Sequence, residues 1–122
     1  MTLFHDDVYD DGLQTITDNA DALHLCSADP ELTWANIASY SLGSKSSPTV
    51  GAPTDRAGGG RKVVVSAIID GAGTGTGTVT HYALVDTGNT KILVSGALDS
   101  SRTIENGDIF LTPEFDIGIP TA

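Results

Sequence analysis

The chain has 122 residues, with sixteen Asp or Glu against six Lys or Arg, so its formal net charge is −10. This length suits one domain with a real hydrophobic core, and we expect residues 1–122 to form a single domain. The acidic balance argues against direct nucleic-acid binding, because counterion release needs clustered Lys and Arg. Hydrophobic residues make up 39% of the chain, too many for a disordered acidic tail.

The sequence predicts neither a membrane span nor a disulfide framework. It contains no apolar run of about eighteen residues, and its acidic start is unlike the basic start of a secretory signal. The single cysteine, Cys26, has no partner for an internal disulfide. Cys26 follows the apolar run Ala22-Leu23-His24-Leu25, so we expect a buried and unreactive thiol.

The charge is concentrated at the N-terminal end. Residues 1–31 hold eight acids and no Lys or Arg, a charge of −8, and the remaining residues sum to −2. The eight acids are Asp6, Asp7, Asp10, Asp11, Asp18, Asp21, Asp29 and Glu31. We therefore expect an acidic N-terminal segment, 1–21, attached to a nearly balanced domain.

Helical spacing of apolar residues predicts an amphipathic helix over residues 6–20. The apolar stripe contains Val8, Tyr9, Gly12, Leu13, Ile16 and Ala20. Asp6 and Asp7 would lie in its first turn, where carboxylates favour the helix dipole. Gly12 on the apolar side suggests close approach of another backbone.

Between this helix and residue 60 the signals are mixed. Leu23 and Leu25 alternate with His24, which predicts a short strand closed by the turn 28–30. Residues 31–42 fit either a short helix around Trp34 and Ile37 or a strand over 38–42. Residues 43–60 are rich in Gly, Ser, Pro and Thr, and we expect a long surface loop there.

The second half predicts consecutive strands at 62–70, 78–85, 91–98 and 110–119. A hairpin loop is expected at 86–90, and Asn106-Gly107 is the strongest hairpin signal in the sequence. The Gly-Thr tract 71–78 lacks the helix and the Lys that a phosphate loop needs. It predicts a flexible turn or a flat strand that another chain approaches closely. The expected fold is mostly β, an antiparallel β-sandwich or jelly-roll-like barrel over 22–122 with an N-terminal α-helix.

The residues that carry metal or base chemistry do not form a recognisable site. Asp6, Asp7, Asp10 and Asp11 recur at i and i+4 and suggest calcium, but a helix rarely converges enough oxygens on one ion. We interpret them as a solvated helix start. His5, His24 and His81 lie on separate elements without ligand spacing. We therefore expect no catalytic, cofactor-binding or metal-binding residues.

One short motif favours an enzyme as a remote alternative. Ala83-Leu84-Val85-Asp86-Thr87-Gly88 resembles the catalytic loop of dimeric retroviral-type aspartic proteases, and the resemblance implies a homodimer with Asp86 as the catalytic carboxylate. No flap hairpin fits after Gly88, and Asp116-Ile117-Gly118 matches the expected C-terminal pattern only loosely. Asp-Thr-Gly-Asn is also a good turn sequence.

The aromatic residues Trp34, Tyr40 and Tyr82 are candidates for a sugar-binding platform. We interpret them instead as anchors in the core or at an interface.

The order of these features is similar to that of small β-rich virion proteins of tailed bacteriophages. The similarity covers most of residues 5–119. It runs through the helix, the strand 23–30, the Gly/Ser-rich excursion 43–60, the blocks 80–86 and 92–98, the segment 103–108 and the closing strand 115–119.

The resemblance implies a structural protein of the virion and no enzymatic activity. A capsid decoration (cement) protein would bind and stabilise the major capsid protein shell, commonly as a homotrimer. A tail-fibre or collar component binding other tail proteins or host glycans is the alternative. Such a chain would be made in the host bacterial cytoplasm and end on the capsid surface, with no cofactor and no membrane partner. The acidic N-terminal quarter and residues 43–60 are the expected contact elements, docking on a basic shell surface.

Overall fold

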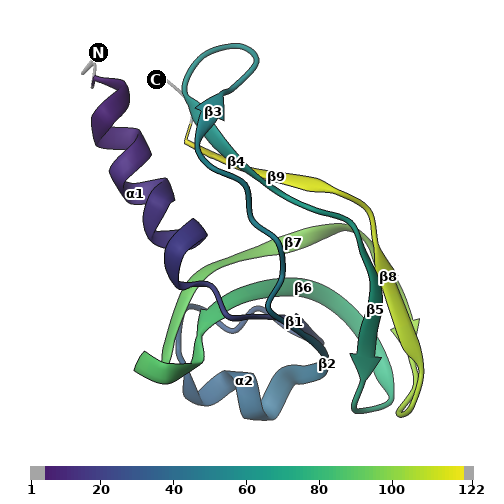
Figure 1. Ribbon diagram of the computed structural model, residues 1–122. Helices are drawn as coiled ribbons and strands as arrows, with labels where there is room; N and C mark the ends of the chain where they lie inside the picture. The colour runs from purple at the N-terminus through teal and green to yellow at the C-terminus, as the bar shows by residue number, and fades with distance from the viewer. Residues whose placement is uncertain (1–4, 120–122) are drawn as a thin grey trace.

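The computed structural model describes residues 5–119, and for residues 6–8 it describes the backbone alone. Helix α1 (Asp6–Asn19) precedes strand β1 (Ala22–Cys26), helix α2 (Ala35–Tyr40) and strand β2 (Ser41–Ser46). The remaining elements are strands and one 3-10 turn (Figure 1): β3 (Thr54–Asp55), β4 (Arg61–Val65), β5 (Ile68–Gly73), β6 (Gly77–Asp86), η1 (Thr87–Asn89), β7 (Lys91–Ile104), β8 (Ile109–Thr112) and β9 (Phe115–Ile119).

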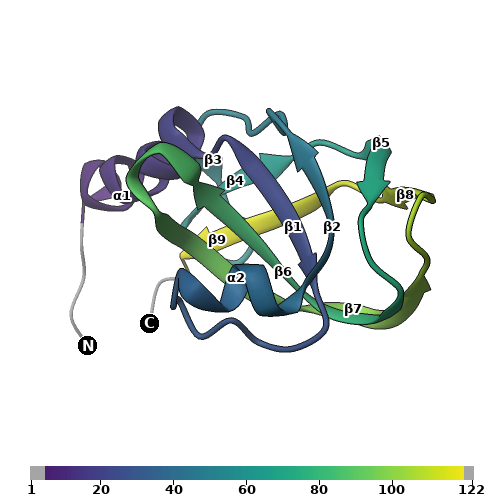
Figure 2. The ribbon, with the colours of Figure 1, turned by 90° about the horizontal axis from the view of Figure 1, so that it is seen from below.

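The strands form two antiparallel sheets, which confirms the predicted mostly-β class with an N-terminal helix. The larger sheet has six strands in the order β7-β6-β1-β2-β5-β8, and the smaller has the order β3-β4-β9. The larger sheet curls strongly (Figures 1 and 2), so its two edge strands turn toward each other. Arg102 of β7 donates a hydrogen bond to the carbonyl oxygen of Leu111 in β8 across this seam.

Most of the core lies inside the curl. The buried side chains of this cluster come from α1 and from both sheets: Leu13, Ile16, Leu23, Leu25, Val63, Val65, Ile68, Val79, Leu84, Ile104 and Phe110. Because they arrive from distant parts of the sequence, burying them holds the helix and the two sheets together. The side chain of α1 residue Asp10 also meets Arg61 of β4, with its Oδ1 2.8 Å from Nε.

A second buried cluster lies on the opposite face of the larger sheet, under α2. It consists of Cys26, Ile37, Ala83, Val85 and Ile92, with Trp34 and Tyr40 packed against it. The structure therefore resolves the open alternative for residues 31–42 as a helix followed directly by a strand. Cys26 is fully buried, as predicted, and burial raises the pKa of its thiol to about 11.

The prediction of a loop over 43–60 is wrong at its start, because residues 43–46 belong to β2. This strand pairs with β1 on one side and β5 on the other. Gly43 lies where a Cβ would be 3.0 Å from the Ile104 side chain and 3.1 Å from the Ala72 carbonyl oxygen. Pairing on both edges thus holds residues 43–46 in an extended conformation, although their Gly, Ser and Lys side chains show no pattern typical of a strand. Farther along, Val50 forms an isolated bridge with Val65, and β3 pairs with β4.

Two predicted strands are each divided between the sheets. The predicted strand 62–70 breaks after Val65, so that β4 lies in the smaller sheet and β5 in the larger. The predicted strand 110–119 breaks at 113–114, where Pro113 has no N–H to donate to a ladder. These two breaks are the corners at which the chain passes from one sheet to the other.

The Asn106-Gly107 prediction is correct for the turn and wrong for the hairpin. Gly107 has a positive φ of 91°, and Asp108 donates its N–H to the Glu105 carbonyl oxygen at 3.0 Å. The flanking strands, however, pair elsewhere, β7 with β6 and β8 with β5. The 86–90 hairpin forms as predicted, since β6 and β7 pair on either side of it.

The two glycine predictions have opposite outcomes. Gly12 is exposed, and a Cβ built on it meets nothing within 4 Å, so the expected backbone contact at this point of α1 is wrong. Gly71 in the Gly-Thr tract does lie in a closely approached strand, where a Cβ would be 2.2 Å from the Phe110 ring. The close neighbour is another strand of the same chain.

Candidate functional site

A hollow of about 190 Å³ lies at the seam, between β7 and the corner that joins β8 to β9. Its apolar lining includes Leu23 and Leu25 of β1 and the aromatic pair of Tyr82 and Phe115, whose ring centroids are 4.8 Å apart. The remaining lining residues are Ala97, Leu98, Asp99, Ser100, Arg102, Thr112, Pro113 and Asp116. The site therefore combines apolar surface with charged and hydroxyl groups.

An irregularity in β7 shapes this hollow. His81 pairs with Ala97 and Val79 pairs with Arg102, so residues 98–101 of β7 lie opposite Thr80 alone. Extra residues on one strand bend it and re-aim its side chains, and such bulges are common beside binding sites. Here the irregular stretch supplies Leu98, Asp99 and Ser100 to the hollow.

The polar groups around the hollow are partly engaged. Arg102 reaches Leu111 across the seam, and Asp116 is paired with Lys62 at 3.1 Å. The Thr112 hydroxyl is buried without a hydrogen-bond partner among the described residues. A buried unsatisfied hydroxyl costs about 1–3 kcal/mol. Burial raises the pKa of Tyr82.

The size of the hollow favours a side chain over a whole substrate. Pockets for small molecules and cofactors typically enclose roughly 300–1,000 Å³, more than the approximately 190 Å³ measured for this one. Among the side chains that the structure describes, which do not include those of residues 6–8, no three His, Cys, Asp or Glu gather in a metal-binding arrangement. The hollow is therefore smaller than a typical substrate pocket.

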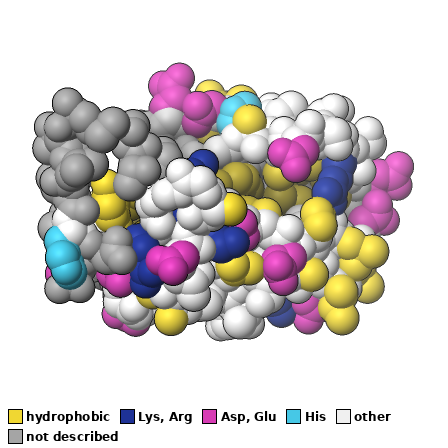
Figure 3. Space-filling view, turned by 90° about the horizontal axis from the view of Figure 1, so that it is seen from above, with side chains coloured by type: hydrophobic (Ala, Val, Ile, Leu, Met, Phe, Trp, Pro, Cys, Tyr) yellow, Lys and Arg dark blue, Asp and Glu magenta, His cyan; other side chains and the backbone are white. Residues whose placement is uncertain are grey.

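A second feature is an exposed apolar patch, which we call the outer face and define as Ile69, Ile109 and Leu111. These side chains are 75%, 71% and 58% exposed. They alternate in β5 and β8 with the buried Ile68, Phe110 and Thr112. Hydrophobic side chains gather at one end of the molecule, on the right of the view in Figure 3. Exposed aliphatic groups clustered in this way mark contact surfaces in folded proteins.

Asp86, the residue of the protease alternative, lies at a hairpin turn. It closes β6, and its Oδ2 accepts a hydrogen bond from Asn89 Nδ2 at 2.7 Å. Asp86 pairs in register with Lys91 and does not line the seam hollow. The Asp-Thr-Gly motif thus adopts the turn conformation that its composition also predicts.

Asp21 holds this turn from the end of the N-terminal segment. Its Oδ1 accepts hydrogen bonds from the Thr87 N–H at 3.0 Å and from the Thr87 hydroxyl at 2.8 Å. The Thr87 N–H is the largest cause of a lowered pKa of the Asp21 carboxyl. No sequence pattern predicts this contact, because the two residues are 66 positions apart.

We expect Asp21→Ala to lower the free energy of unfolding by about 0.5–1 kcal/mol at neutral pH, the lower part of the range for loss of a capping side chain, because Asp21 is exposed. The pKa of Asp21 is lower in the folded protein than the usual 3.8. Its stabilising contribution is therefore complete above that value and declines as pH falls through the folded pKa. Urea unfolding at a series of pH values should show the difference between variant and wild type shrinking below about pH 4. A difference that does not change with pH would contradict the role of the charge.

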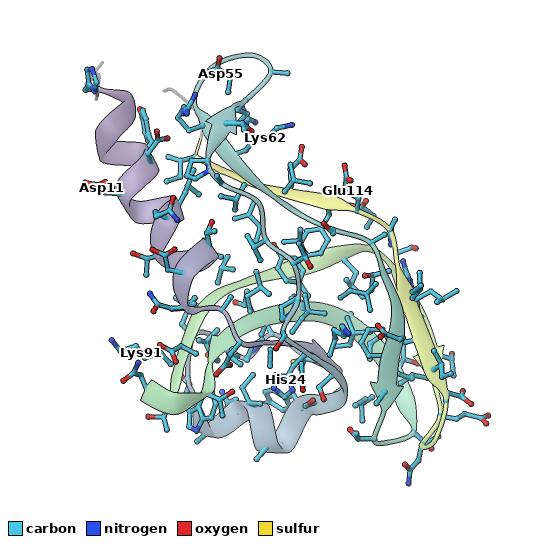
Figure 4. The ribbon with its side chains drawn as sticks, in the orientation of Figure 1. Asp11, His24, Asp55, Lys62, Lys91 and Glu114 are labelled. Atoms are coloured by element: carbon cyan, nitrogen blue, oxygen red, sulfur yellow. The ribbon has the colours of Figure 1, made fainter. Side chains whose placement is uncertain are left out.

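Several acids of the N-terminal quarter make contacts within the chain. Asp10 binds Arg61, Asp18 accepts a hydrogen bond from Gln14 at 2.8 Å, and Asp29 accepts one from the Glu31 N–H at 2.9 Å. The side chains of Asp6 and Asp7 lie outside the described residues. Asp11 is exposed and points away from the sheets (Figure 4).

The histidines remain separate, but the structure gives His24 a partner that the sequence did not predict. Its Nδ1 lies 2.8 Å from Ser41 Oγ, a nucleophile-and-base pair by distance. Ser41 Oγ also lies 3.2 Å from the Gly43 carbonyl oxygen, to which it can donate. Burial lowers the pKa of His24, and neither residue lines the seam hollow. The contact joins β1 to β2.

The aromatic candidates pack as predicted. Trp34 and Tyr40 lie against the cluster under α2, and Tyr82 lies against the inner core. Tyr82 is the one of these three that also reaches the hollow.

No protein-family model matches the sequence of this chain. No curated protein and no solved structure matches it either. Among the helices described, none is long and apolar enough to cross a membrane.

Proposed function

We propose that this chain is a structural virion protein of a tailed bacteriophage, a capsid decoration protein that binds and stabilises the major capsid protein shell. The order of sequence features suggests the family. The observation that carries a binding role is the outer face, three large aliphatic side chains held exposed on a rigid sheet. Such a surface is expected of a protein that works by contact with other proteins.

The fold suits a protein that must remain stable on a particle. The two sheets share one core, and Tyr82 of the larger sheet packs on Phe115 of the smaller. Lys62 and Asp116 join neighbouring strands at 3.1 Å. These contacts hold the fold together without a disulfide.

The exposed acids of α1 are the proposed contact with a basic shell surface. Asp11 and Asp18 are both exposed and lie seven positions apart, so they share one side of the helix. Asp10 is committed to Arg61, and Asp21 to Thr87. We therefore propose Asp11 and Asp18 as the docking carboxylates of the helix.

The double variant Asp11→Lys/Asp18→Lys should bind decoration-free particles of the encoding phage at least about tenfold more weakly at low salt. Reversing two charges at a rim reduces electrostatic attraction, and the deficit should shrink as salt rises. Co-sedimentation of purified chain with particles measures the affinity. A matched reversal at exposed sites elsewhere, Glu105→Lys/Glu114→Lys, should retain more of the binding.

Two outcomes would contradict this proposal. Wild-type chain that fails to bind its own phage particles would end the virion role. An equal loss of particle affinity in both double variants would show that α1 is not the contact with the shell. A copy number that follows the shell lattice supports decoration, whereas a small multiple of the tail symmetry supports the tail-fibre or collar alternative.

A further inference from the structure

We propose that the outer face is where copies of this chain associate, each covering Ile69, Ile109 and Leu111 of its neighbour with its own. This inference rests on the proposed function, in which many copies of the chain bind one particle. It assigns the contact between neighbouring copies to one surface. The starting observation is that these large aliphatic side chains are all more than half exposed on adjacent strands.

The strand pairing holds the three side chains together. Ala72 pairs with Ile109 and Ile68 with Thr112, and an irregularity between Ile68 and Gly71 places Ile69 and Asp70 opposite Leu111. Both Ile69 and Asp70 are consequently exposed. The outer face is therefore a continuous patch across β5 and β8.

The patch is also rigid from beneath. Phe110 packs directly on Gly71, and Gly73 accepts a hydrogen bond from the Gly107 N–H at 2.9 Å and donates one to the Asp108 carbonyl oxygen at 2.7 Å. A face held in this way loses little conformational freedom when a partner covers it.

A partner must cover this surface face-on. Arg102 donates to the Leu111 carbonyl oxygen across the seam, so this acceptor on the outer edge of β8 is already engaged. Addition of a foreign strand to that edge would have to break this contact. Packing against the side chains of the outer face leaves it intact.

Charge favours a second copy at this end of the molecule. Figures 1 and 2 both place α1, with its acidic residues, at one end and the β5–β8 pair at the other. Beside the outer face, Asp70 is paired with Lys45 at 3.0 Å, and the exposed carboxylates of Glu105 and Asp108 lie in the turn that precedes β8. Two chains of net charge −10 repel least when their acidic helices point apart. Contact through the outer faces gives that arrangement and matches apolar surface with apolar surface.

The size of the patch predicts weak association in free solution. Three aliphatic side chains expose on the order of a few hundred Å², whereas a standard interface covers roughly 800 Å² per partner. Association should strengthen when a particle holds copies side by side, because the contact then becomes effectively intramolecular. It should also strengthen with salt, which screens the repulsion between acidic chains.

Sedimentation velocity of the purified chain over a wide concentration range tests the inference directly. Wild type should show reversible, salt-promoted association, and Leu111→Ser should weaken it at least tenfold. Leu32→Ser is the matched control, because Leu32 is 61% exposed and Leu111 is 58% exposed. It should associate like wild type. Both leucines are surface residues, so both variants should fold.

A cross-linking experiment detects association that is too weak to be seen by sedimentation velocity. Cys26 is buried with its thiol pKa raised to about 11, so it should not react with the mild oxidant diamide. Under diamide, Leu111→Cys should form disulfide-linked dimers at least tenfold faster than Leu32→Cys. Equal rates, together with a wild-type chain that stays monomeric, would overturn the inference.

The same variants separate this inference from the proposed function. If Leu111→Cys cross-links no faster than Leu32→Cys, both free and bound to the particle, while Leu111→Ser loses particle binding, the outer face contacts the shell protein. Self-association is then wrong while the virion role stands. If wild type self-associates through Leu111 but binds no particle, the inference stands and the proposed function fails.

Discussion

Replacing Gly71 by Ala should lower the free energy of unfolding by about 3 kcal/mol or more, the upper end of the cost of overpacking a core. A Cβ at this position would lie 2.2 Å from Phe110 Cζ and 2.3–2.4 Å from both Cε atoms. Phe110 is only 7% exposed, so its ring has little room to withdraw. Urea unfolding followed by circular dichroism measures the loss.

A second substitution tests the mechanism of this loss. Phe110→Leu removes the ring atoms that meet the new methyl group, so Gly71→Ala should cost less in that background, a coupling that a double-mutant cycle reports. Gly12→Ala is the contrasting control. Its methyl group meets nothing within 4 Å, so it should stabilise α1 by up to about 1 kcal/mol. Equal costs of Gly71→Ala in both backgrounds would show that Phe110 is not the obstacle.

The sequence predicted those parts of the fold that depend on neighbouring residues. Alternation identified β1, and the turn composition of residues 86–90 identified the hairpin between β6 and β7. The amphipathic stripe identified α1 within one residue of its end. Each signal lies within a short window, where side-chain period and turn chemistry determine conformation.

The remaining features depend on pairing between distant segments. β2 is a strand because β1 and β5 flank it, although apart from Leu42 its own residues are small or polar. The turn at Asn106-Gly107 joins strands that pair with other partners, because β7 and β8 lie at opposite edges of the larger sheet. Turn chemistry specifies a reversal of the chain but not which strands finally pair.

The candidate surfaces were hidden from the sequence for the same reason. The seam hollow requires the irregular pairing of residues 98–101 with Thr80, and a polar run such as Asp99-Ser100-Ser101 also suits an ordinary loop. The outer face was more accessible to sequence reasoning, since Ile109 and Leu111 alternate with Phe110 and Thr112. The sequence does not show which of the two alternating sets of side chains faces the core.

The structure also changes how the acidic quarter should be tested. Deleting residues 1–20 is a natural way to ask whether this segment docks on a partner. However, Leu13 and Ile16 of α1 are 2% and 8% exposed and belong to the main core. Such a deletion would expose that core, so loss of binding would report unfolding. Charge changes at exposed positions of the helix avoid this ambiguity.

Leu13→Ala should therefore lower the free energy of unfolding by about 2–5 kcal/mol, the range for truncating a buried leucine. Domains of this kind have about 5–15 kcal/mol in total, so the loss is a large fraction. The cost arises because Leu13 belongs to the main core that α1 shares with the two sheets. The helix also packs against β4 and is tied to that strand by Asp10 and Arg61. Asp11→Ala, two positions away on the exposed side, should change stability by no more than about 0.5 kcal/mol. Urea titration of both variants decides the matter, because similar small costs would mean that α1 is a loosely held arm. The carboxylates of α1 would then approach a partner on a flexible tail. A large loss of stability for Leu13→Ala alone means instead that Asp11 and Asp18 are presented on a fixed surface.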